Sequence, residues 1–369
     1  MKVVLTGGGT GGHVYPALAV ADKIREREPD SEIMFLGSSF GFEAQLVPQK
    51  GYDYTIIHAR GMEIGGGFFS KVKELIASII GTGIGIGQAK RELKKLKPQA
   101  VLGTGGFVSL PVILAANSLK IPCYIHEQNT YPGRGNMIMA KYAKKVMLGF
   151  DEAREIFPEK EKMVFVGNPV RDIFLRADKN EARKKLGISL DDFFVFSFGG
   201  SMGSNEINLV AMEHLKRVKD KPGHTVVMGT GEQFYEKIQG ELAKEGIETS
   251  DKIRVYDYIE NMDDHIAAAD LIIARAGALT IAEITTCGRA AIYIPLSWSV
   301  NNHQYYNAKS IVDRGGGLLV DETTMDVGHV CDQIDSLAED KEKLRTMEEA
   351  SKKCSMPYAA DSIYEVLKG

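Results

Sequence analysis

Short apolar runs alternate with longer amphipathic stretches along most of the 369-residue chain. The apolar runs are rich in β-branched and aromatic side chains, which is typical of buried strands. Regular alternation of such strands with helices predicts βαβ units and mostly parallel sheets. Strands are predicted at residues 3–5, 33–36, 54–57, 100–102, 123–125, 145–148, 164–166, 193–196, 225–228, 253–256, 271–273, 291–294 and 318–320, with helices between them, for example at 17–27 and 88–96.

The strand–helix pattern starts again near residue 190, which predicts a second domain. The chain is also longer than one hydrophobic core usually supports. Residues 167–171, with the sequence GNPVR, form the best linker candidate because glycine, asparagine and proline favour turns. We therefore expect two doubly wound α/β domains, one over residues 1–167 and one over residues 168–354.

Three glycine clusters each follow a predicted strand directly. They are GGGTGGH at 7–13, GTGG at 103–106 and GGSMG at 199–203. Glycine lets the backbone turn sharply beside an anion, and the N-terminus of a following helix offers N–H groups to it. Ligands of doubly wound sheets bind at the carboxyl ends of the strands. The three loops therefore predict a phosphate-bearing ligand between the domains.

The first cluster also matches the dinucleotide fingerprint G-x-G-x-x-G through Gly7, Gly9 and Gly12. A dinucleotide site needs an acidic residue at the end of the second strand to hold the ribose. Here that strand ends in LGSS at 36–39, without an acid, which disfavours a nicotinamide-dependent oxidoreductase. A tight turn that packs strand against helix explains some of these glycines, but it does not explain five of them followed by His13.

His13 and the run HEQN at 126–129 are the candidate catalytic groups of the first half. The positive end of a helix favours neutral imidazole, which can accept a proton, although an isolated histidine is often structural. The polar run follows a predicted strand and can bind sugar hydroxyls or supply a second carboxylate. The alternative is a solvated loop.

Two segments of the second half are candidates for sugar-nucleotide contacts. Residues 275–283 open a helix with small side chains, and Glu283 can accept hydrogen bonds from both ribose hydroxyls. The alternative is a capping box formed by Thr280 and Glu283. Residues 301–307 are dense in amide and hydroxyl groups, which suit either a neutral sugar or a solvated helix start.

Composition and the segment 61–97 limit the choice of partners. The net charge of −4 disfavours a general nucleic-acid partner, and four separated cysteines without a C-x-x-C pair predict a reducing compartment. No signal peptide or bilayer-spanning stretch is predicted, so we expect a cytoplasmic protein. In segment 61–97 a glycine loop at 65–67, aromatic residues and lysines suggest docking on an anionic membrane surface. A packed helix with a small-residue face is the alternative.

Six motifs occur together in a fixed order. They are GGTGGH at 8–13, TGGFVS at 104–109, HEQN at 126–129, GNPVR at 167–171, GGS at 199–201 and GALTIAE at 277–283. With the region around Gln304 and Asn307, they resemble the MurG family of bacterial cell-wall N-acetylglucosaminyltransferases. The resemblance implies a GT-B fold, with two Rossmann-like domains facing across a cleft and a C-terminal helix, about 355–369, that rejoins the first domain.

The resemblance also implies a role for individual residues. His13 is the first candidate for the catalytic base and Glu127 the second, and Arg171 and Ser201 would contact the diphosphate. The resemblance further implies that Ile259 contacts the uracil and Glu283 the ribose. Asn129, His303 and Gln304 would contact the sugar. The implied donor set is Thr10, Gly11, Gly12, His13, Asn129, Arg171, Ser201, Ile259, Ala278, Leu279, Thr280, Glu283, His303 and Gln304, and the implied acceptor set is Gly11, Gly12, Gly105, Gly106 and Phe107.

Two positions depart from the family pattern. Met202 and His303 stand where the family commonly has glutamine. The implied activity is an inverting transfer of N-acetylglucosamine from UDP-N-acetylglucosamine to the C4 hydroxyl of an undecaprenyl-linked muramyl-pentapeptide. It would take place at the cytoplasmic face of the cell membrane, with peripheral attachment, and would need no cofactor and no obligatory metal. The alternatives are a GT-B transferase with another acceptor, a UDP-N-acetylglucosamine epimerase and a non-enzymatic nucleotide-binding module.

Overall fold

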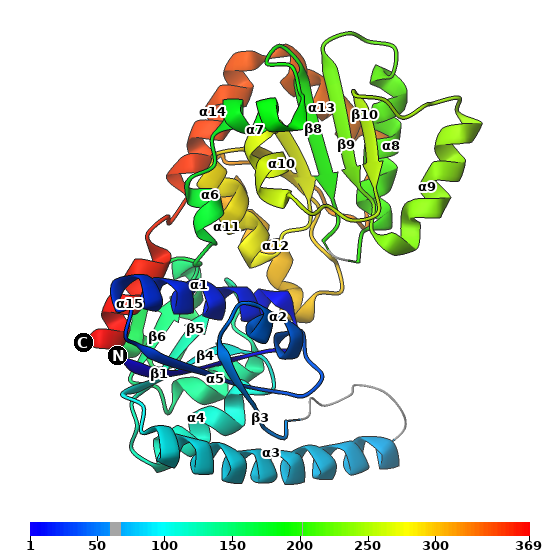
Figure 1. The fold of residues 1–369 in the computed structure, drawn as a ribbon. Helices are drawn as coiled ribbons and strands as arrows, with labels where there is room; N and C mark the ends of the chain where they lie inside the picture. The colour runs from blue at the N-terminus through cyan, green and yellow to red at the C-terminus, as the bar shows by residue number, and fades with distance from the viewer. Residues whose placement is uncertain (60–67, 201) are drawn as a thin grey trace. The chain divides into compact units, whose positions relative to one another are not determined.

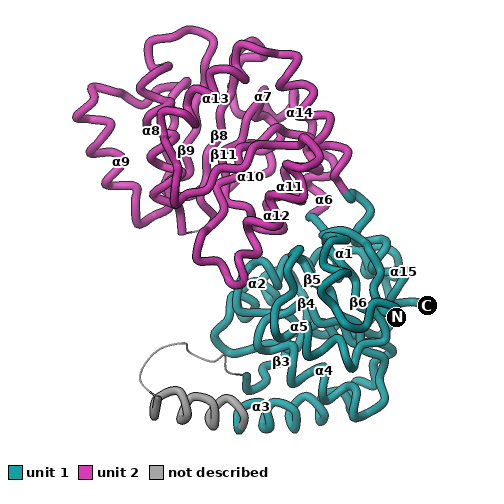
Figure 2. Tube along the Cα trace, turned by 180° about the vertical axis from the view of Figure 1, so that it is seen from behind, with its two compact units in different colours: residues 1–170, 356–369 teal, residues 171–355 magenta. Residues whose placement is uncertain are grey.

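The computed structural model describes residues 1–59, 68–200 and 202–369. For residues 68–79 it describes the backbone only. The chain forms two compact units, coloured separately in Figure 2. The first contains Met1–Val170 and Met356–Gly369, and the second contains Arg171–Ser355. The chain therefore passes between the units twice, after Val170 and after Ser355.

The first unit is built on a seven-stranded parallel sheet of order β3-β2-β1-β4-β5-β6-β7. Side chains of successive strand residues point to opposite faces, so Val3 and Leu5 enter one core while Val4 enters the other. Both faces are therefore buried, as expected for a parallel sheet. The strands are β1 Lys2–Gly7, β2 Glu32–Gly37, β3 Asp53–Ile56, β4 Ala100–Gly105, β5 Cys123–Glu127, β6 Lys145–Leu148 and β7 Met163–Phe165.

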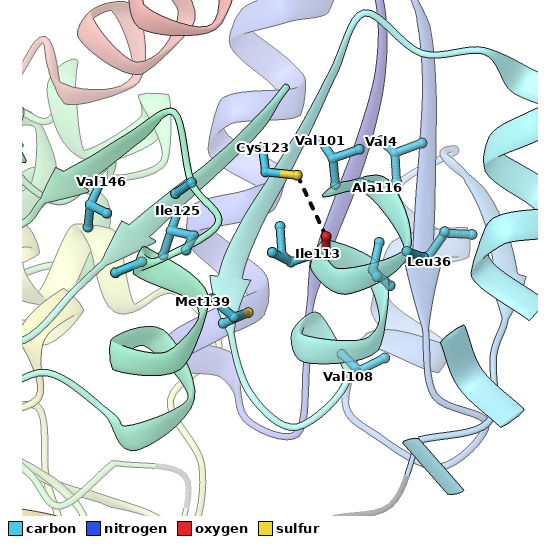
Figure 3. Close-up of a cluster of buried hydrophobic side chains, with 14 of the residues drawn as sticks. Val4, Leu36, Val101, Val108, Ile113, Ala116, Cys123, Ile125, Met139 and Val146 are labelled. Atoms are coloured by element: carbon cyan, nitrogen blue, oxygen red, sulfur yellow. Dashed lines mark hydrogen bonds between the residues drawn. The ribbon is translucent and has the colours of Figure 1, made fainter. Parts of the chain in front are cut away.

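Helices cover both faces of this sheet. One core joins the sheet to α1 and α15, and the other joins it to α3, α4 and α5. Figure 3 shows the second core, where Cys123 and Val101 lie near Ile113 and the Cys123 thiol donates to the Ile113 carbonyl over 3.7 Å. The helices are α1 Gly11–Arg27, α2 Glu43–Gln49, α3 Phe68–Leu96, α4 Ser109–Ser118, α5 Arg134–Ala140 and α15 Ala359–Lys368, with 3₁₀ turns η1 Asp151–Glu155 and η2 Lys160–Lys162.

The C-terminal helix α15 packs beside α1 in the first unit (Figure 1). Ile363 and Leu367 enter the same core as the residues of α1. At the rim, Arg27 pairs with Asp361 at 2.5 Å, and the Tyr364 hydroxyl donates to Glu28 at 2.9 Å. The last residues of the chain therefore complete the hydrophobic core of the first unit.

The second unit repeats the topology with a six-stranded parallel sheet of order β10-β9-β8-β11-β12-β13. Its strands are β8 Phe193–Phe198, β9 His224–Gly229, β10 Ile253–Tyr256, β11 Leu271–Ala274, β12 Ala290–Tyr293 and β13 Leu318–Leu319. Its helices are α6 Asp172–Leu175, α7 Lys179–Leu186, α8 Asn205–Val218, α9 Glu232–Lys244, α10 Met262–Ala268, α11 Ala278–Cys287, α12 His303–Val312, α13 Val327–Glu339 and α14 Lys341–Lys353, with the 3₁₀ turn η3 Val300–Asn302.

All the predicted strands are present, but two helices differ from prediction. Helix α1 begins at Gly11 instead of residue 17, although glycine disfavours helix by about 1 kcal/mol relative to alanine. Helix α3 continues through the alternating glycines at 81–87. A β-carbon at Gly85 would lie 2.2 Å from the carbonyl oxygen of His58, so this glycine allows close packing, whereas β-carbons at Gly83 and Gly87 would meet open space.

The predicted glycine loop at 65–67 lies outside the described residues. In the described part of α3, Ile80 and Ile84 are exposed. Among the helices of residues 1–59, 68–200 and 202–369, none is both long and apolar enough to cross a bilayer.

Candidate functional site

The first glycine loop joins β1 to α1 and ends at His13. Thr10 occupies the N-cap position in an extended conformation, so the first turn of α1 contains Gly11, Gly12 and His13. The first amides of a helix have no partner within the helix and carry the positive end of its dipole. This turn can therefore bind an anion or favour an uncharged imidazole.

The second glycine loop, after β4, lies directly against the first. The Gly8 amide donates to the Gly105 carbonyl over 3.3 Å. Gly105 and Gly106 have φ values of +109° and +81°, in the region that favours glycine. A β-carbon at Gly106 would lie 2.1 Å from the Gly8 carbonyl oxygen, and one at Gly105 would lie 3.0 Å from the imidazole of His13. The structure thus brings His13 and the glycines predicted for the acceptor together.

Phe107, also predicted for the acceptor, belongs to an aromatic rim on these loops. Its ring stacks on Phe40 with the centroids 5.7 Å apart and lies next to Gly9. Phe42 packs at a tilt against Tyr15 of α1, with ring centroids 6.0 Å apart. Phe40 and Phe42 are exposed, so apolar surface borders the glycine loops.

The imidazole of His13 is held in its neutral form. Burial lowers the pKa of His13 from 6.5 to about 4, and the negative charge of Glu43 opposes this shift only in part. Nδ1 of His13 is buried and has no hydrogen-bond partner among the described residues. A neutral imidazole keeps one nitrogen lone pair for accepting a proton. His13 therefore has the protonation state that a general base requires at neutral pH.

Glu127, at the end of β5, uses both carboxylate oxygens to organise its own loop. Oε1 accepts from the backbone and side-chain amides of Asn129, at 2.9 and 3.2 Å. Oε2 accepts from the Gly133 amide at 3.0 Å and from Asn136 Nδ2 at 2.8 Å. Burial raises the pKa of Glu127, and these four donors lower it. Glu127 therefore fixes the place of Asn129, which is predicted to contact the donor sugar.

His126 and Gln128 connect the end of β5 to Gly167 and Asn168, which precede the second unit. Nε2 of His126 donates to the Gly167 carbonyl over 2.9 Å, and its Nδ1 accepts from Gln128 at 3.0 Å. Asn168 donates to the Gln128 carbonyl over 2.9 Å. All three polar side chains are buried. They hold the segment before the second unit against β5.

The third glycine loop joins β8 to α8 in the second unit. Ser201, predicted to contact the diphosphate, lies outside the described residues. Ser204 caps α8, its hydroxyl accepting from the Ile207 amide at 3.3 Å. A β-carbon at Gly203 would lie 2.1 Å from the Thr230 carbonyl oxygen, so this loop packs tightly on the loop after β9.

Glu283 lies in the second turn of α11, the helix predicted to bind the ribose. The helix begins at Ala278 with Gly277 as its N-cap, so Thr280 is inside the helix and the capping-box alternative is wrong. Burial raises the pKa of Glu283 from 4.5 to about 7, opposed by the charge of Arg171. The guanidinium of Arg171 lies 3.7 Å from the Glu283 carboxylate. These two predicted donor residues therefore lie side by side.

The other predicted donor residues of the second unit lie in the loop after β10 and in the first turns of α12 and α11. Ile259 is buried against Gly229, where a β-carbon would lie 2.9 Å from its side chain. The Gln304 side-chain oxygen accepts from the Leu296 amide at 3.0 Å, which orients the side-chain amide. In the first turn of α11, Ala278 is buried while Leu279 and Thr280 are partly exposed.

The two departures from the family pattern have different surroundings. The side chain of Met202 is exposed, and its carbonyl accepts from Gln233 at 2.7 Å. Nδ1 of His303 donates to the Val300 carbonyl over 2.7 Å. In a neutral imidazole this leaves Nε2 as an acceptor. His303 is thus expected to accept a hydrogen bond from a sugar hydroxyl, whereas glutamine could also donate one.

Two charged side chains near the glycine loops were not predicted from the sequence. Glu43 contacts the loop after β1, and its only sequence signal is an acid at the start of a short helix. Arg275 follows β11 and bonds Glu206 at 2.7 Å, the Ile294 carbonyl at 3.0 Å and Glu322. Glu322 in turn accepts from the Ser297 amide at 2.6 Å, so this cluster fixes the loop after β12.

Comparison with known proteins assigns the class of protein. Residues 3–148 match the model of the glycosyltransferase family 28 N-terminal domain, and residues 194–363 match that of the C-terminal domain. The crystal structure of MurG from Acinetobacter baumannii superposes with a TM-score of 0.76 at 28% identity, covering 100% of this chain and 99% of that one. Two Rossmann-like units of this kind define a GT-B glycosyltransferase.

Sequence relatives narrow this assignment. The chain is 39% identical to the "UDP-N-acetylglucosamine--N-acetylmuramyl-(pentapeptide) pyrophosphoryl-undecaprenol N-acetylglucosamine transferase" of Acetivibrio thermocellus, covering 100% of this chain and 98% of the relative. It is 40% identical to the protein of the same name from Clostridioides difficile, covering 100% of this chain and 89% of the relative. The chain belongs to the MurG family of N-acetylglucosaminyltransferases.

Proposed function

We propose that this protein transfers N-acetylglucosamine from UDP-N-acetylglucosamine to the C4 hydroxyl of an undecaprenyl-linked muramyl-pentapeptide. The C4 oxygen attacks the anomeric carbon as its proton leaves, a new C–O bond forms, and the bond to the UDP oxygen breaks. A single displacement inverts the anomeric centre from α to β. The names of relatives that match the whole chain at 39–40% identity support this choice of donor and acceptor.

The observation that carries the mechanism is the position of His13 where two glycine loops meet. Its imidazole lies against Gly105 and is neutral at pH 7 because burial holds its pKa near 4. The amides of the first turn of α1 lie beside it and suit the acceptor diphosphate. His13 therefore takes the proton of the C4 hydroxyl, while the adjacent glycines hold the acceptor diphosphate.

Glu127 is the second candidate for the base, and its contacts favour a different role. Four donors already engage its two carboxylate oxygens. Taking a proton from substrate would break at least one of these buried hydrogen bonds, at a cost of about 1–3 kcal/mol. Glu127 therefore positions Asn129 for the donor sugar, and His13 remains the base.

The second unit holds the donor. Glu283 accepts hydrogen bonds from the two ribose hydroxyls, and Ile259 lies against the uracil. Arg171, Ser201 and the small residues that open α11 neutralise the charge that develops on the leaving UDP. Gln304 and His303 bind hydroxyls of the N-acetylglucosamine. The closeness of Arg171 to Glu283, at 3.7 Å, supports a shared place for the ribose and the diphosphate.

Peripheral attachment to the cytoplasmic face of the cell membrane is part of the proposal. The acceptor is a lipid, so the first unit must reach a bilayer surface. Exposed Ile80 and Ile84 on α3, followed by Lys94 and Lys95 in its last turn, support contact with an anionic surface. A vesicle-binding assay with and without anionic lipid would test this contact.

The decisive experiment is incubation with UDP-N-acetylglucosamine and a lipid-linked muramyl acceptor analogue. Formation of a β-linked disaccharide with release of UDP is the expected result. Conversion of the UDP-sugar without acceptor would indicate an epimerase, and binding without turnover would indicate a nucleotide-binding module. Transfer only to a different acceptor would indicate another GT-B transferase.

His13→Ala tests the base within this reaction. We expect turnover to fall by roughly 10²–10⁴-fold, which is the usual contribution of general base catalysis. Binding of UDP-N-acetylglucosamine is measured separately by calorimetry, because His13 is also an implied donor contact, and it should fall far less than turnover. His58→Ala is the matched control because His58 is an exposed histidine of the same unit. Turnover of His13→Ala within about threefold of wild type would exclude His13 as the base.

A further inference from the structure

Glu43 is a buried carboxylate of the first unit that has no part in the scheme above. It is the first residue of α2 and is 1% exposed. Oε2 accepts from the Gly9 amide at 2.9 Å, and Oε1 accepts from the amide and the hydroxyl of Ser38 at 3.2 and 2.7 Å. Donors from two different βα loops therefore converge on one carboxylate.

Two glycines make room for this carboxylate. A β-carbon at Gly8 would lie 2.3 Å from Oε1 of Glu43, and one at Gly41 would lie 2.1 Å from Oε2. Neither glycine has a positive φ, so the backbone conformation does not require glycine at these two positions. Glycine is required there because the Glu43 carboxylate occupies the space that a β-carbon would fill.

The residues that surround the Glu43 carboxylate are themselves held by hydrogen bonds. The Ser38 hydroxyl accepts from the Gly41 amide at 2.9 Å, and the Tyr54 hydroxyl donates to the Ser38 carbonyl over 2.5 Å. On the other side, Gly8 is bonded to the second glycine loop through the Gly105 carbonyl. The contacts therefore run from β3 through Glu43 to the loop against which His13 packs.

The carboxylate also decides which part of the first glycine loop can bind an anion. Glu43 already occupies the Gly9 amide, and its negative charge repels a phosphate at that end of the loop. The first-turn amides of α1, beyond Thr10, are not engaged by Glu43. An acceptor diphosphate is thus directed toward the amides of Gly11 and Gly12, because the His13 amide already donates to the Thr10 carbonyl over 3.1 Å.

We propose that Glu43 is a positioning residue for sugar transfer, which ties the turn at Gly8 and Gly9 to the loop after β2 and so places His13 and the first turn of α1. The inference rests on the proposed function, because it assigns the placement of the proposed base to a residue outside the reacting groups. Both carboxylate oxygens of Glu43 are engaged by Gly9 and Ser38, so its removal should slow turnover far more than it weakens donor binding.

Glu43→Gln is the first test, since glutamine keeps the shape but has only one acceptor oxygen. Its NH₂ group then faces an N–H donor, and we expect kcat to fall about tenfold or more from one unpaired buried donor. The donor KM and the calorimetric Kd for UDP-N-acetylglucosamine should stay within twofold. Glu28→Gln is the matched control: Glu28 also accepts two donors in the first unit, at the opposite end of α1, and its variant should keep the kcat of wild type.

Gly41→Ala is the second test, in case Glu43→Gln folds poorly. Its β-carbon displaces the carboxylate while Glu43 and the first glycine loop keep their sequence. We expect the same reduction of kcat with an unchanged donor KM, and little further loss when Gly41→Ala is added to Glu43→Ala.

The outcomes separate the two proposals. If wild type forms no disaccharide, the proposed function fails whatever the variants do. If wild type is active and both Glu43→Gln and Gly41→Ala keep kcat within threefold, the role of Glu43 is wrong. A loss of kcat accompanied by an equal loss of donor affinity and a large fall in Tm would also overturn it, because it would indicate general destabilisation.

Discussion

Glu283→Gln should make the second unit more stable and its donor binding weaker. The pKa of Glu283 is raised from 4.5 to about 7 by burial, so the folded protein holds this proton more tightly than the unfolded chain does. Stability therefore falls as pH rises from about 4.5 to about 7, and the full cost is present above pH 7. At about 1.4 kcal/mol per pH unit, that cost is about 3 kcal/mol.

The stability of the variant is measured by calorimetric unfolding of the full chain at two pH values. Glutamine carries no charge, so the variant should exceed wild type by up to about 3 kcal/mol at pH 8 and by less than about 1 kcal/mol at pH 5. For a unit of this size, that gain at pH 8 corresponds to a rise in Tm of roughly 6 °C. Glu339→Gln, which changes an exposed glutamate of α13 in the same unit, is the control and should shift neither value.

The binding part of the prediction uses the intact UDP-sugar, whose diphosphate diester does not titrate between pH 6 and 8. If only ionised Glu283 accepts the ribose hydroxyls, its ionised fraction falls about tenfold between pH 8 and pH 6, and the Kd of wild type should rise by the same factor. Glu283→Gln should bind with a Kd independent of pH, and about 10–100-fold more weakly than wild type at pH 8.

Two results would refute this reasoning. A variant that keeps the tenfold pH dependence would show that another group controls donor binding. A variant no more stable than wild type at pH 8 would show that the buried carboxylate is not strained by its charge. A 2′-deoxyribose analogue of the donor provides a second control, because it should lose part of the pH dependence in wild type.

Two further predictions concern the loops around the substrates. Glu127→Gln places an NH₂ group against the donors that now bond the carboxylate, so the free energy of unfolding should fall by about 1–3 kcal/mol. The value of kcat should also fall, because Asn129 is displaced. An unchanged Tm in thermal unfolding would refute this role. Trp298 is the only tryptophan, is 80% exposed, and lies two residues after Leu296, whose amide bonds Gln304. Its fluorescence should change more with UDP-N-acetylglucosamine than with UDP, and equal changes would place this loop away from the sugar.

Much of the fold could be predicted because strand signals in this chain are local. Each buried strand is a short apolar run between glycine-rich or polar turns, so composition and spacing suffice. The apolar pattern places the start of α1 at residue 17, and only the glycine motif before His13 indicates an earlier helix N-terminus. Its first turn contains two glycines and is held by β4, which lies far away in sequence: the Thr104 hydroxyl donates to the His13 carbonyl over 2.6 Å. Tertiary contacts therefore override the low helix propensity of glycine there.

The candidate site was predictable only where a motif carries the chemistry. His13 and Glu283 stand in recognisable runs, although the N-cap at Gly277 was needed to reject the capping box. Glu43 has no such motif. The sequence near the end of β2 offers no acid, and the carboxylate comes instead from the first residue of α2. Its role becomes visible only when the missing β-carbons of Gly8 and Gly41 are placed in three dimensions.

The carboxylates of Glu43, Glu127 and Glu283 are held in different ways in the two units. In the first unit, backbone amides donate to both oxygens of Glu43, and two donors bond each oxygen of Glu127. Both carboxylates therefore stabilise the loops around them. Burial raises the pKa of both Glu127 and Glu283. Four hydrogen-bond donors oppose the shift at Glu127, whereas at Glu283 it is opposed by the Arg171 guanidinium, 3.7 Å away. A ligand that donates two hydroxyls would oppose the shift at Glu283 further. The carboxylates of Glu43 and Glu127 therefore have their hydrogen bonds without a ligand, whereas we expect Glu283 to gain its own when the proposed sugar nucleotide binds.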